Sequence, residues 1–252
     1  MMVQTLRAPL LLLVILLVAL AWLRQGGESP ARQASVGSTV VPDFSQYQEV
    51  AEKKKAFFSY LRPLVEAENA RILTERGRLK ALLGKRKLSP AEQEWLDNLA
   101  IRYDVPLPLD TEGRQTLLRR VDKLPVALVL VQAANESAWG TSRFAIDGNN
   151  FFGQWCYVEG CGLVPQDRVE GASHEVAKFS SPQASVRSYI HNINTNNAYR
   201  GLREIRQTAR QKGQDPKAES LVQGLMRYSE RGGAYVRELS SMISHNRRYM
   251  TD

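Results

Sequence analysis

One segment, residues 125–140 (PVALVLVQAANESAWG), limits the folds available to this chain more than any other. It opens with a proline and a run of six apolar residues. No turn signal interrupts it for about 14 residues, which is long for a buried strand and ordinary for a helix. Because apolar side chains occupy almost every position, we expect a helix that is buried nearly all round.

Helical patterns also precede this segment. Apolar side chains recur every three or four residues over 44–84, which predicts a long amphipathic helix with a bend near Pro63. Ser89 and Glu92 form a capping box with a proline at the first helical position, so a second helix begins there. A third, shorter helix is expected over 112–123.

The pattern changes after residue 140. Glycines and aromatic residues alternate over 148–171, and residues 174–179 alternate in the manner of a strand. We expect a loop and a β-hairpin here. Helical patterns then return in four segments: 181–193, 199–211, a segment capped by Asp215 and Pro216, and 233–249.

The N-terminus carries a targeting segment. Sixteen residues from Ala8 to Leu23 have no charged or polar side chain, which suits a signal peptide or a short membrane anchor. Residues 19–21 supply an A-x-A cleavage pattern, so cleavage and retention both stay open. We therefore expect a signal peptide or anchor over 1–23, a linker over 24–43, and a location in the periplasm or cell envelope.

Charge and cysteine content agree with export. The chain has 34 Lys and Arg against 26 Asp and Glu, a net charge of +8, which predicts an anionic partner. Outside the cytoplasm that partner is the cell wall or the inner-membrane surface, and not nucleic acid.

Cys156 and Cys161 have four residues between them and would form a disulfide in an oxidising compartment. A zinc site would need two more ligands, and the three histidines lack suitable spacing, so no metal or organic cofactor is expected.

Glu136 is the candidate for chemistry. It lies near the end of the apolar helix, where burial would raise the pKa of its carboxyl. A carboxyl with a raised pKa suits the general acid of a glycosidase. Trp139, three residues on, would share the helix face and offer a stacking surface for a sugar. The alternative is a solvent-facing glutamate or an ion pair with Arg143.

Three motifs resemble one known family. The run AANESAWGTSRFAIDGNNFFGQW (133–155) resembles the catalytic segment of the bacterial peptidoglycan-hydrolysing glucosaminidases. The stretches FSSPQASVRSYIHNINTNNAYRGLREIR (179–206) and LMRYSERGGAYVRELSSMI (225–243) continue the likeness. Within the family the chain resembles the Bax-type envelope proteins, which share the cysteine pair and a helical N-terminal extension.

The resemblance implies a mainly α, lysozyme-like (α+β) fold. A helical lobe would hold the acid, and a β-hairpin would form the other wall of a cleft. The catalytic domain would cover 121–252, preceded by a helical extension over 44–120. The implied activity is hydrolysis of β-1,4 bonds after N-acetylglucosamine in peptidoglycan. The alternatives are a lytic transglycosylase, a zinc amidase and an inactive glycan-binding envelope protein.

The resemblance also implies roles for individual residues. Glu136 matches the general acid, and Tyr228 matches a tyrosine that faces the site. Many members place a second carboxylate on the hairpin, for which Glu170 and Glu175 are the candidates, although the Thr-rich lead typical of the family is missing. The substrate's own 2-acetamido group would be an alternative nucleophile. The candidate substrate-binding residues are Trp139, Asn150, Phe152, Trp155 and Tyr199; Asn150 would equally serve the backbone of its turn.

Overall fold

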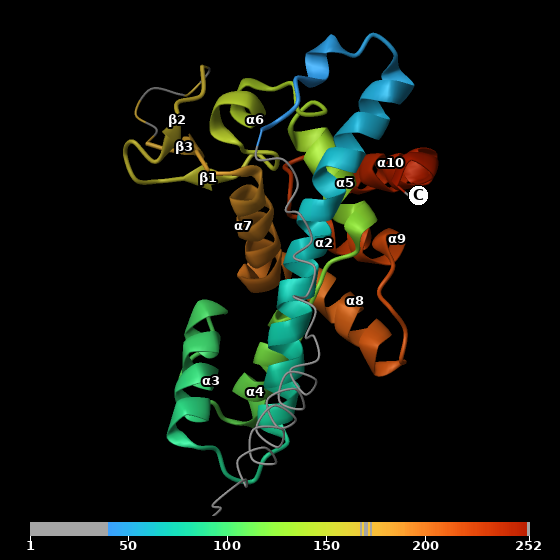
Figure 1. Cartoon of the computed structure of the whole chain (residues 1–252). Helices are drawn as coiled ribbons and strands as arrows, with labels where there is room; N and C mark the ends of the chain where they lie inside the picture. Colours follow the sequence, from blue (N-terminus) through green and yellow to red (C-terminus); the bar gives the residue numbers. More distant parts are fainter. Residues whose placement is uncertain (1–39, 167, 169–170, 172, 251–252) are drawn as a thin grey trace, which may run out of the picture. The chain divides into compact units, whose positions relative to one another are not determined.

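The computed structural model describes residues 40–166, 168, 171 and 173–250 (Figure 1). The targeting segment, most of the linker and Glu170 lie outside the described residues. All described residues belong to one compact unit, which spans 37–252. This unit is mainly helical with a small antiparallel sheet, as expected. Among the described helices, none is both long and apolar enough to cross a membrane.

The helices follow the predicted segments closely. The long helix passes through Pro63 without ending. The helices are α2 (Val50–Leu83), α3 (Pro90–Arg102), α4 (Thr111–Arg120), α5 (Val126–Glu136), α6 (Arg143–Gly148), α7 (Pro182–Thr195), α8 (Arg200–Gln211), α9 (Ala218–Leu221) and α10 (Gly233–Met250), with 3-10 turns at Phe44–Gln46, Asn197–Tyr199 and Val222–Leu225.

Local capping explains where several helices begin. The Ser89 hydroxyl accepts from the Glu92 amide, and the Glu92 carboxylate accepts from the Ser89 amide, so the predicted capping box is confirmed. The prediction that Asp215 caps the following helix is wrong. α9 starts after Lys217, because the Asp215 carboxylate instead forms ion pairs with Lys123 and Arg210.

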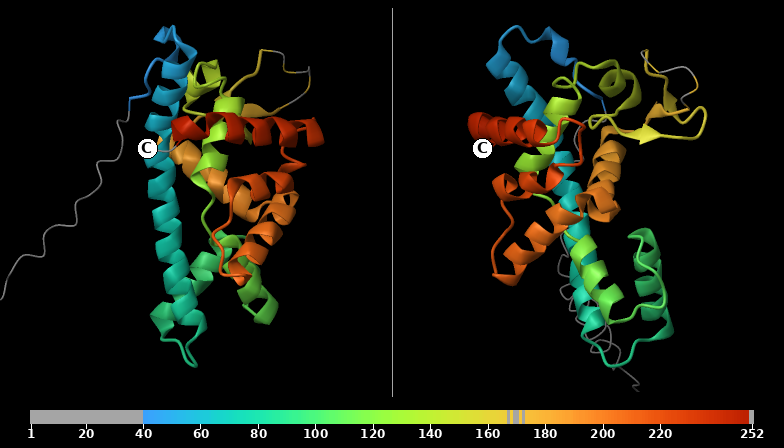
Figure 2. Two further views of the ribbon diagram at one scale, coloured as in Figure 1. Left: turned by 90° about the vertical axis from the view of Figure 1, so that its right-hand side faces the viewer. Right: turned by 180° about the vertical axis from the view of Figure 1, so that it is seen from behind.

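Helix α5 lies at the centre of the core. Every residue from Leu128 to Ala134 is buried, and α2 and α10 pack against the helix. Figure 2 shows α2 running alongside the other helices, and it contacts α4, α5, α7 and α10. The apolar segment at residues 125–140 therefore contains the buried helix that its pattern predicts.

The β insert contains three short strands instead of a single hairpin. They are β1 (Trp155–Cys156), β2 (Gly162–Leu163) and β3 (Glu175–Ala177). β3 lies between the other two, and its Val176 pairs with Trp155 on one side and Leu163 on the other. Cys156 and Cys161 form the predicted disulfide, with their Cα atoms 6.3 Å apart.

Candidate active site

Glu136 is the last residue of α5, and the chain turns sharply after it. Ala138, Trp139 and Gly140 have φ angles of 50°, 60° and 77°, which a right-handed α-helix does not allow. The Ser137 hydroxyl stabilises the turn by accepting from the Gly140 amide at 2.8 Å. This turn places the carboxyl at the exposed end of an otherwise buried helix.

Trp139 is therefore not on the same helix face as Glu136, and that prediction is wrong. Its indole lies edge-on to the rings of Phe57 and Phe58, at centroid distances of 5.7 and 5.3 Å. The Lys54 ammonium lies 5.2 Å from the centre of the indole. The contacts of Trp139 are thus with α2, and its role in binding a sugar stays a prediction.

The environment of the Glu136 carboxyl confirms the expected rise of its pKa. Burial raises the pKa above its usual value, and the nearby Glu238 carboxylate adds to the increase. Two donors act in the opposite direction: the Tyr235 hydroxyl at 2.8 Å and the Asn135 amide at 3.2 Å, both on Oε1. The alternative partner Arg143 donates instead to the Val164 carbonyl.

A chain of buried hydrogen bonds fixes the direction in which Tyr235 donates. The Tyr189 hydroxyl donates to Oε1 of Gln132, which sets the orientation of that amide. The Gln132 Nε2 group then donates to the Tyr235 hydroxyl oxygen at 3.0 Å. Because that oxygen accepts from Gln132, its own proton is directed to Oε1 of Glu136. A proton on the carboxyl is consequently carried by Oε2.

Glycine lies in front of Oε2. A Cβ built on Gly153 would be 3.9 Å from this oxygen, and the backbone there has a φ of 63°. Any other residue would be strained and would extend its side chain from this point. Gly153 therefore keeps the space beside the acidic oxygen free of a side chain.

Asn150 and Phe152 build the turn that positions Gly153. The Asn150 Nδ2 group donates to the carbonyls of Gln154 and Ala177 at 2.9 and 2.8 Å. Its Oδ1 accepts from the amides of Phe152 and Gln154 at 3.2 and 3.1 Å. Of the two roles weighed for Asn150, these contacts support the one in the turn. Phe152 is buried and stacks on Tyr189, with ring centroids 4.0 Å apart.

Tyr228 supports this site without bonding to the carboxyl. Its ring stacks on Tyr235 at 5.5 Å with an interplanar angle of 5°, and its hydroxyl donates to the Phe152 carbonyl at 3.0 Å. Tyr199 lies behind it, buried, with its ring centroid 5.7 Å from that of Tyr228. The tyrosine that touches Glu136 is Tyr235, which sequence reasoning missed although it is the second tyrosine of the closing motif.

Two candidate residues of the β insert, Glu175 and Trp155, lie in surroundings that differ from each other. Both oxygens of Glu175 accept backbone bonds, from the amides of Gly160 at 3.0 Å and Gly162 at 2.7 Å. These bonds lower its pKa, so Glu175 is held as a carboxylate that closes the loop. Trp155 is 57% exposed and stacks on His174 at a centroid distance of 4.4 Å.

A cavity of about 390 Å³ lies beside the end of α5, although Glu136 itself is not among the residues that line it. Asn135, which donates to Glu136, and Glu238, which raises its pKa, both lie in the cavity wall. Trp139 lies in the same wall. The remaining residues of the wall come from α2, α5, α10 and the turn after α5: Lys54, Ala134, Ala138, Ser241, Met242, His245 and Asn246.

The Glu136 carboxyl, with its raised pKa, thus lies at the end of a buried helix on a mainly helical scaffold with a small sheet. The chain belongs to the glucosaminidase family, described as mannosyl-glycoprotein endo-beta-N-acetylglucosaminidase, whose family model matches residues 114–248. Family membership assigns the chain to the glycoside hydrolases and makes a glycan its class of substrate.

The chain is also similar to Protein bax of Escherichia coli (strain K12). The two are 36% identical over 216 residues, which cover 85% of this chain and 77% of the E. coli protein. No solved structure matches the chain significantly. The resemblance that the motifs indicate, including the Bax-type likeness, is thus confirmed.

Proposed function

We propose that this protein cleaves β-1,4 bonds after N-acetylglucosamine in peptidoglycan, with Glu136 as the general acid. The observation that carries the proposal is the half-buried Glu136 carboxyl, whose pKa is raised and whose Oε1 is held by Tyr235. A general acid must hold its proton near the working pH, and burial supplies that condition.

The geometry suggests how the proton is delivered. With Oε1 held by Tyr235, the proton on Oε2 faces the space beside Gly153. A glycosidic oxygen in that space would take the proton as its bond to C1 breaks. Tyr235 then continues to donate to the carboxylate left behind, which favours the ionised product of the transfer.

The second catalytic group is proposed to come from the substrate. Both Glu175 oxygens are engaged by the backbone, which disfavours it as a base. The 2-acetamido oxygen of N-acetylglucosamine would instead attack C1 while the leaving oxygen takes the Glu136 proton. Water would next attack C1 and give a proton to the Glu136 carboxylate, and the acetamide would re-form. Two displacements at C1 predict a product with retained configuration, which NMR of fresh digests would detect.

Replacement of Glu136 by Gln tests the proposal. The variant keeps size and hydrogen bonding but has no acidic proton, so digestion of purified sacculi should slow about 100-fold or more. Glu230→Gln, which removes an exposed acid, is the matched control. An unchanged rate in Glu136→Gln would overturn the catalytic role. Mass spectrometry of the products separates the alternatives, because a transglycosylase would leave anhydro sugars and a hydrolase leaves reducing ends.

We further propose that the protein acts in the periplasm or cell envelope, tethered to the inner membrane or released from it. The apolar segment at residues 8–23 supports export. The disulfide between Cys156 and Cys161 suits an oxidising compartment. Fractionation of cells after osmotic shock tests this, and recovery in the cytoplasm would contradict it.

A further inference from the structure

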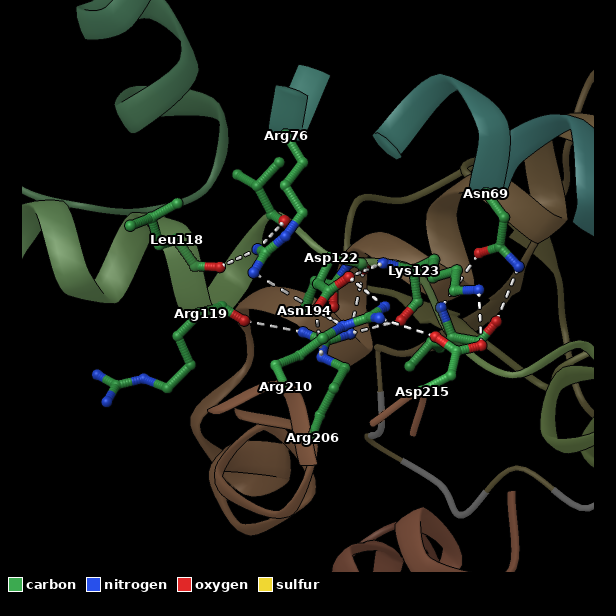
Figure 3. Close-up of polar contacts among 12 residues, drawn as sticks. Asn69, Arg76, Leu118, Arg119, Asp122, Lys123, Asn194, Arg206, Arg210 and Asp215 are labelled. Atoms are coloured by element: carbon green, nitrogen blue, oxygen red, sulfur yellow. Dashed lines mark hydrogen bonds and ion pairs between the residues drawn. The ribbon is translucent and has the colours of Figure 1, made fainter. Parts of the chain in front are cut away.

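A cluster of arginines surrounds one buried carboxylate in the segment before α5, at the opposite end of that helix from Glu136. Asp122, in the segment between α4 and α5, is almost fully buried. Figure 3 shows the polar contacts around it. Arg210 binds it with two bonds of 3.1 Å, from Nε to Oδ2 and from Nη2 to Oδ1. Arg76 of α2 and Arg206 of α8 lie 3.8 and 3.9 Å from Oδ2. Three guanidinium groups therefore share one negative charge.

Backbone carbonyls at the end of α4 make this arrangement stable without neutralising it. Arg206, only 1% exposed, donates to the carbonyls of Arg119 at 2.9 Å and of Asp122 and Lys123 at 3.1 Å. Arg76 donates to the carbonyls of Leu118 and of Val121. The negative end of a helix solvates cations in this way, but its partial charges do not cancel whole ones.

A cavity of about 240 Å³ opens onto the cluster. Five cationic side chains line it against the single carboxylate of Asp122: Arg76, Lys80, Arg119, Arg206 and Arg210. Lys80 is exposed and Arg119 is partly exposed, so solvent reaches the cavity from the side of these two residues. Burial lowers the pKa of Arg206 to about 10; the Asp122 carboxylate opposes this decrease, and the neighbouring arginines add to it.

The available acids do not balance this charge. Asp215 pairs with Arg210 at 2.7 Å but also with Lys123 at 3.0 Å. The Arg119 guanidinium bonds to two neutral partners, the Thr116 hydroxyl and the Gln207 amide oxygen. In the described part of the chain, neither Lys80 nor Arg119 forms an ion pair with a carboxylate.

We propose that this cavity is a binding site for a phosphate-class oxyanion, either free phosphate or the phosphate of a lipid headgroup. Guanidinium groups match phosphate oxygens in paired bonds, and an added oxyanion offsets part of the positive charge that the single Asp122 carboxylate leaves. The cavity size suits a small oxyanion. The site is independent of the glycosidase chemistry at Glu136.

Binding of inorganic phosphate to the full chain tests the site. Phosphate should raise the Tm by more than sodium chloride of equal ionic strength, because a ligand of the folded state stabilises it by mass action. The variant Lys80→Gln/Arg119→Gln removes two accessible charges and spares the buried cluster. Its dissociation constant for phosphate, measured by calorimetry, should rise at least tenfold.

The control is Lys55→Gln/Lys178→Gln, which removes two exposed lysines outside the cavity. This control should bind phosphate like the unchanged protein. Equal stabilisation by phosphate and chloride, or equal binding by the two variants, would overturn the proposal. Vesicles identify the source of the phosphate: if phosphatidylglycerol vesicles displace bound phosphate and phosphatidylcholine vesicles do not, the site takes a lipid headgroup. If neither displaces it, the site takes a soluble phosphate.

Discussion

At the scale of single residues, the Glu136 carboxyl is subject to two opposing effects. Burial favours the neutral acid, whereas bonds from Tyr235 and Asn135 favour the carboxylate. Burial is the larger effect, so the pKa is raised, yet the donors limit the rise. The same donors favour the carboxylate that forms when the proton leaves. Burial thus favours the protonated carboxyl, while Tyr235 and Asn135 stabilise its ionised form.

Replacement of Tyr235 by Phe should separate these two roles. Loss of the hydroxyl removes a bond that lowers the pKa of Glu136, so that pKa should rise further. The alkaline limb of the pH profile of kcat/KM should then move to higher pH. The rate at low pH should fall about tenfold or more, because a hydrogen bond to a charged group is lost. Tyr249→Phe on the same helix is the control, and a limb that moved to lower pH would contradict the assignment.

Sequence reasoning predicted the acid but not its surroundings. An acidic residue at the end of an apolar helix is visible in a short window of sequence, and so is its raised pKa. Tyr235 lies 99 residues further along the chain, so no local pattern joins it to Glu136. The prediction for Trp139 failed because a spacing of three implies a shared face only if the helix continues, and it ends at Glu136.

At the scale of elements, the β insert is held by side chains more than by its strands. The strands contain only two or three residues each and offer few backbone bonds. The disulfide closes one loop of the insert, and Glu175 binds the amides of Gly160 and Gly162 in the same loop. The disulfide and the Glu175 carboxylate therefore hold the loop that leads from β1 to β2.

Removal of the disulfide should loosen this loop and leave the helices intact. In Cys156→Ser/Cys161→Ser, the free energy of unfolding should fall by about 2 kcal/mol, which is the loop-entropy contribution expected of so short a ring. Amide exchange should accelerate in residues 155–163, while α5 and α10 keep their protection. Adding Glu175→Gln should accelerate the exchange further, because a glutamine side chain lacks the negative charge that strengthens the bonds from the Gly160 and Gly162 amides. Loss of protection in α5 would show that the insert is coupled to the core.

Elements could be predicted where their signals are local. The Ser89–Glu92 capping box and the Ser181 cap lie within four residues of the helix starts that they define. Asp215 has the same local signature, but two distant cations take its carboxylate. The third strand was missed for a similar reason, since strand pairing joins residues that are distant in the chain.

At the scale of the whole described unit, α2 completes the core around α5. The side chain of Asn69 binds the Leu124 backbone through both its amide nitrogen and its oxygen, at 2.8 and 3.1 Å, just before α5 begins. At the other end of α5, a Cβ on Gly140 would lie 2.5 Å from the Phe44 ring. Residues of the 44–120 segment therefore contact the chain at both ends of α5, and the turn that orients Glu136 is packed against them.

Phe58→Ala should show whether this packing makes α2 and α5 one cooperative unit. The Phe58 ring is fully buried between Phe57 and Trp139, so truncation should cost about 3–5 kcal/mol. Because α2 and α5 share that core, amide protection should fall together in both helices. Leu73→Ala, on the same helix but 40% exposed, is the control and should have a much smaller effect. If protection fell in α2 while α5 and α7 kept theirs, the 44–120 segment would instead be a separate folding unit docked on an independently stable catalytic domain.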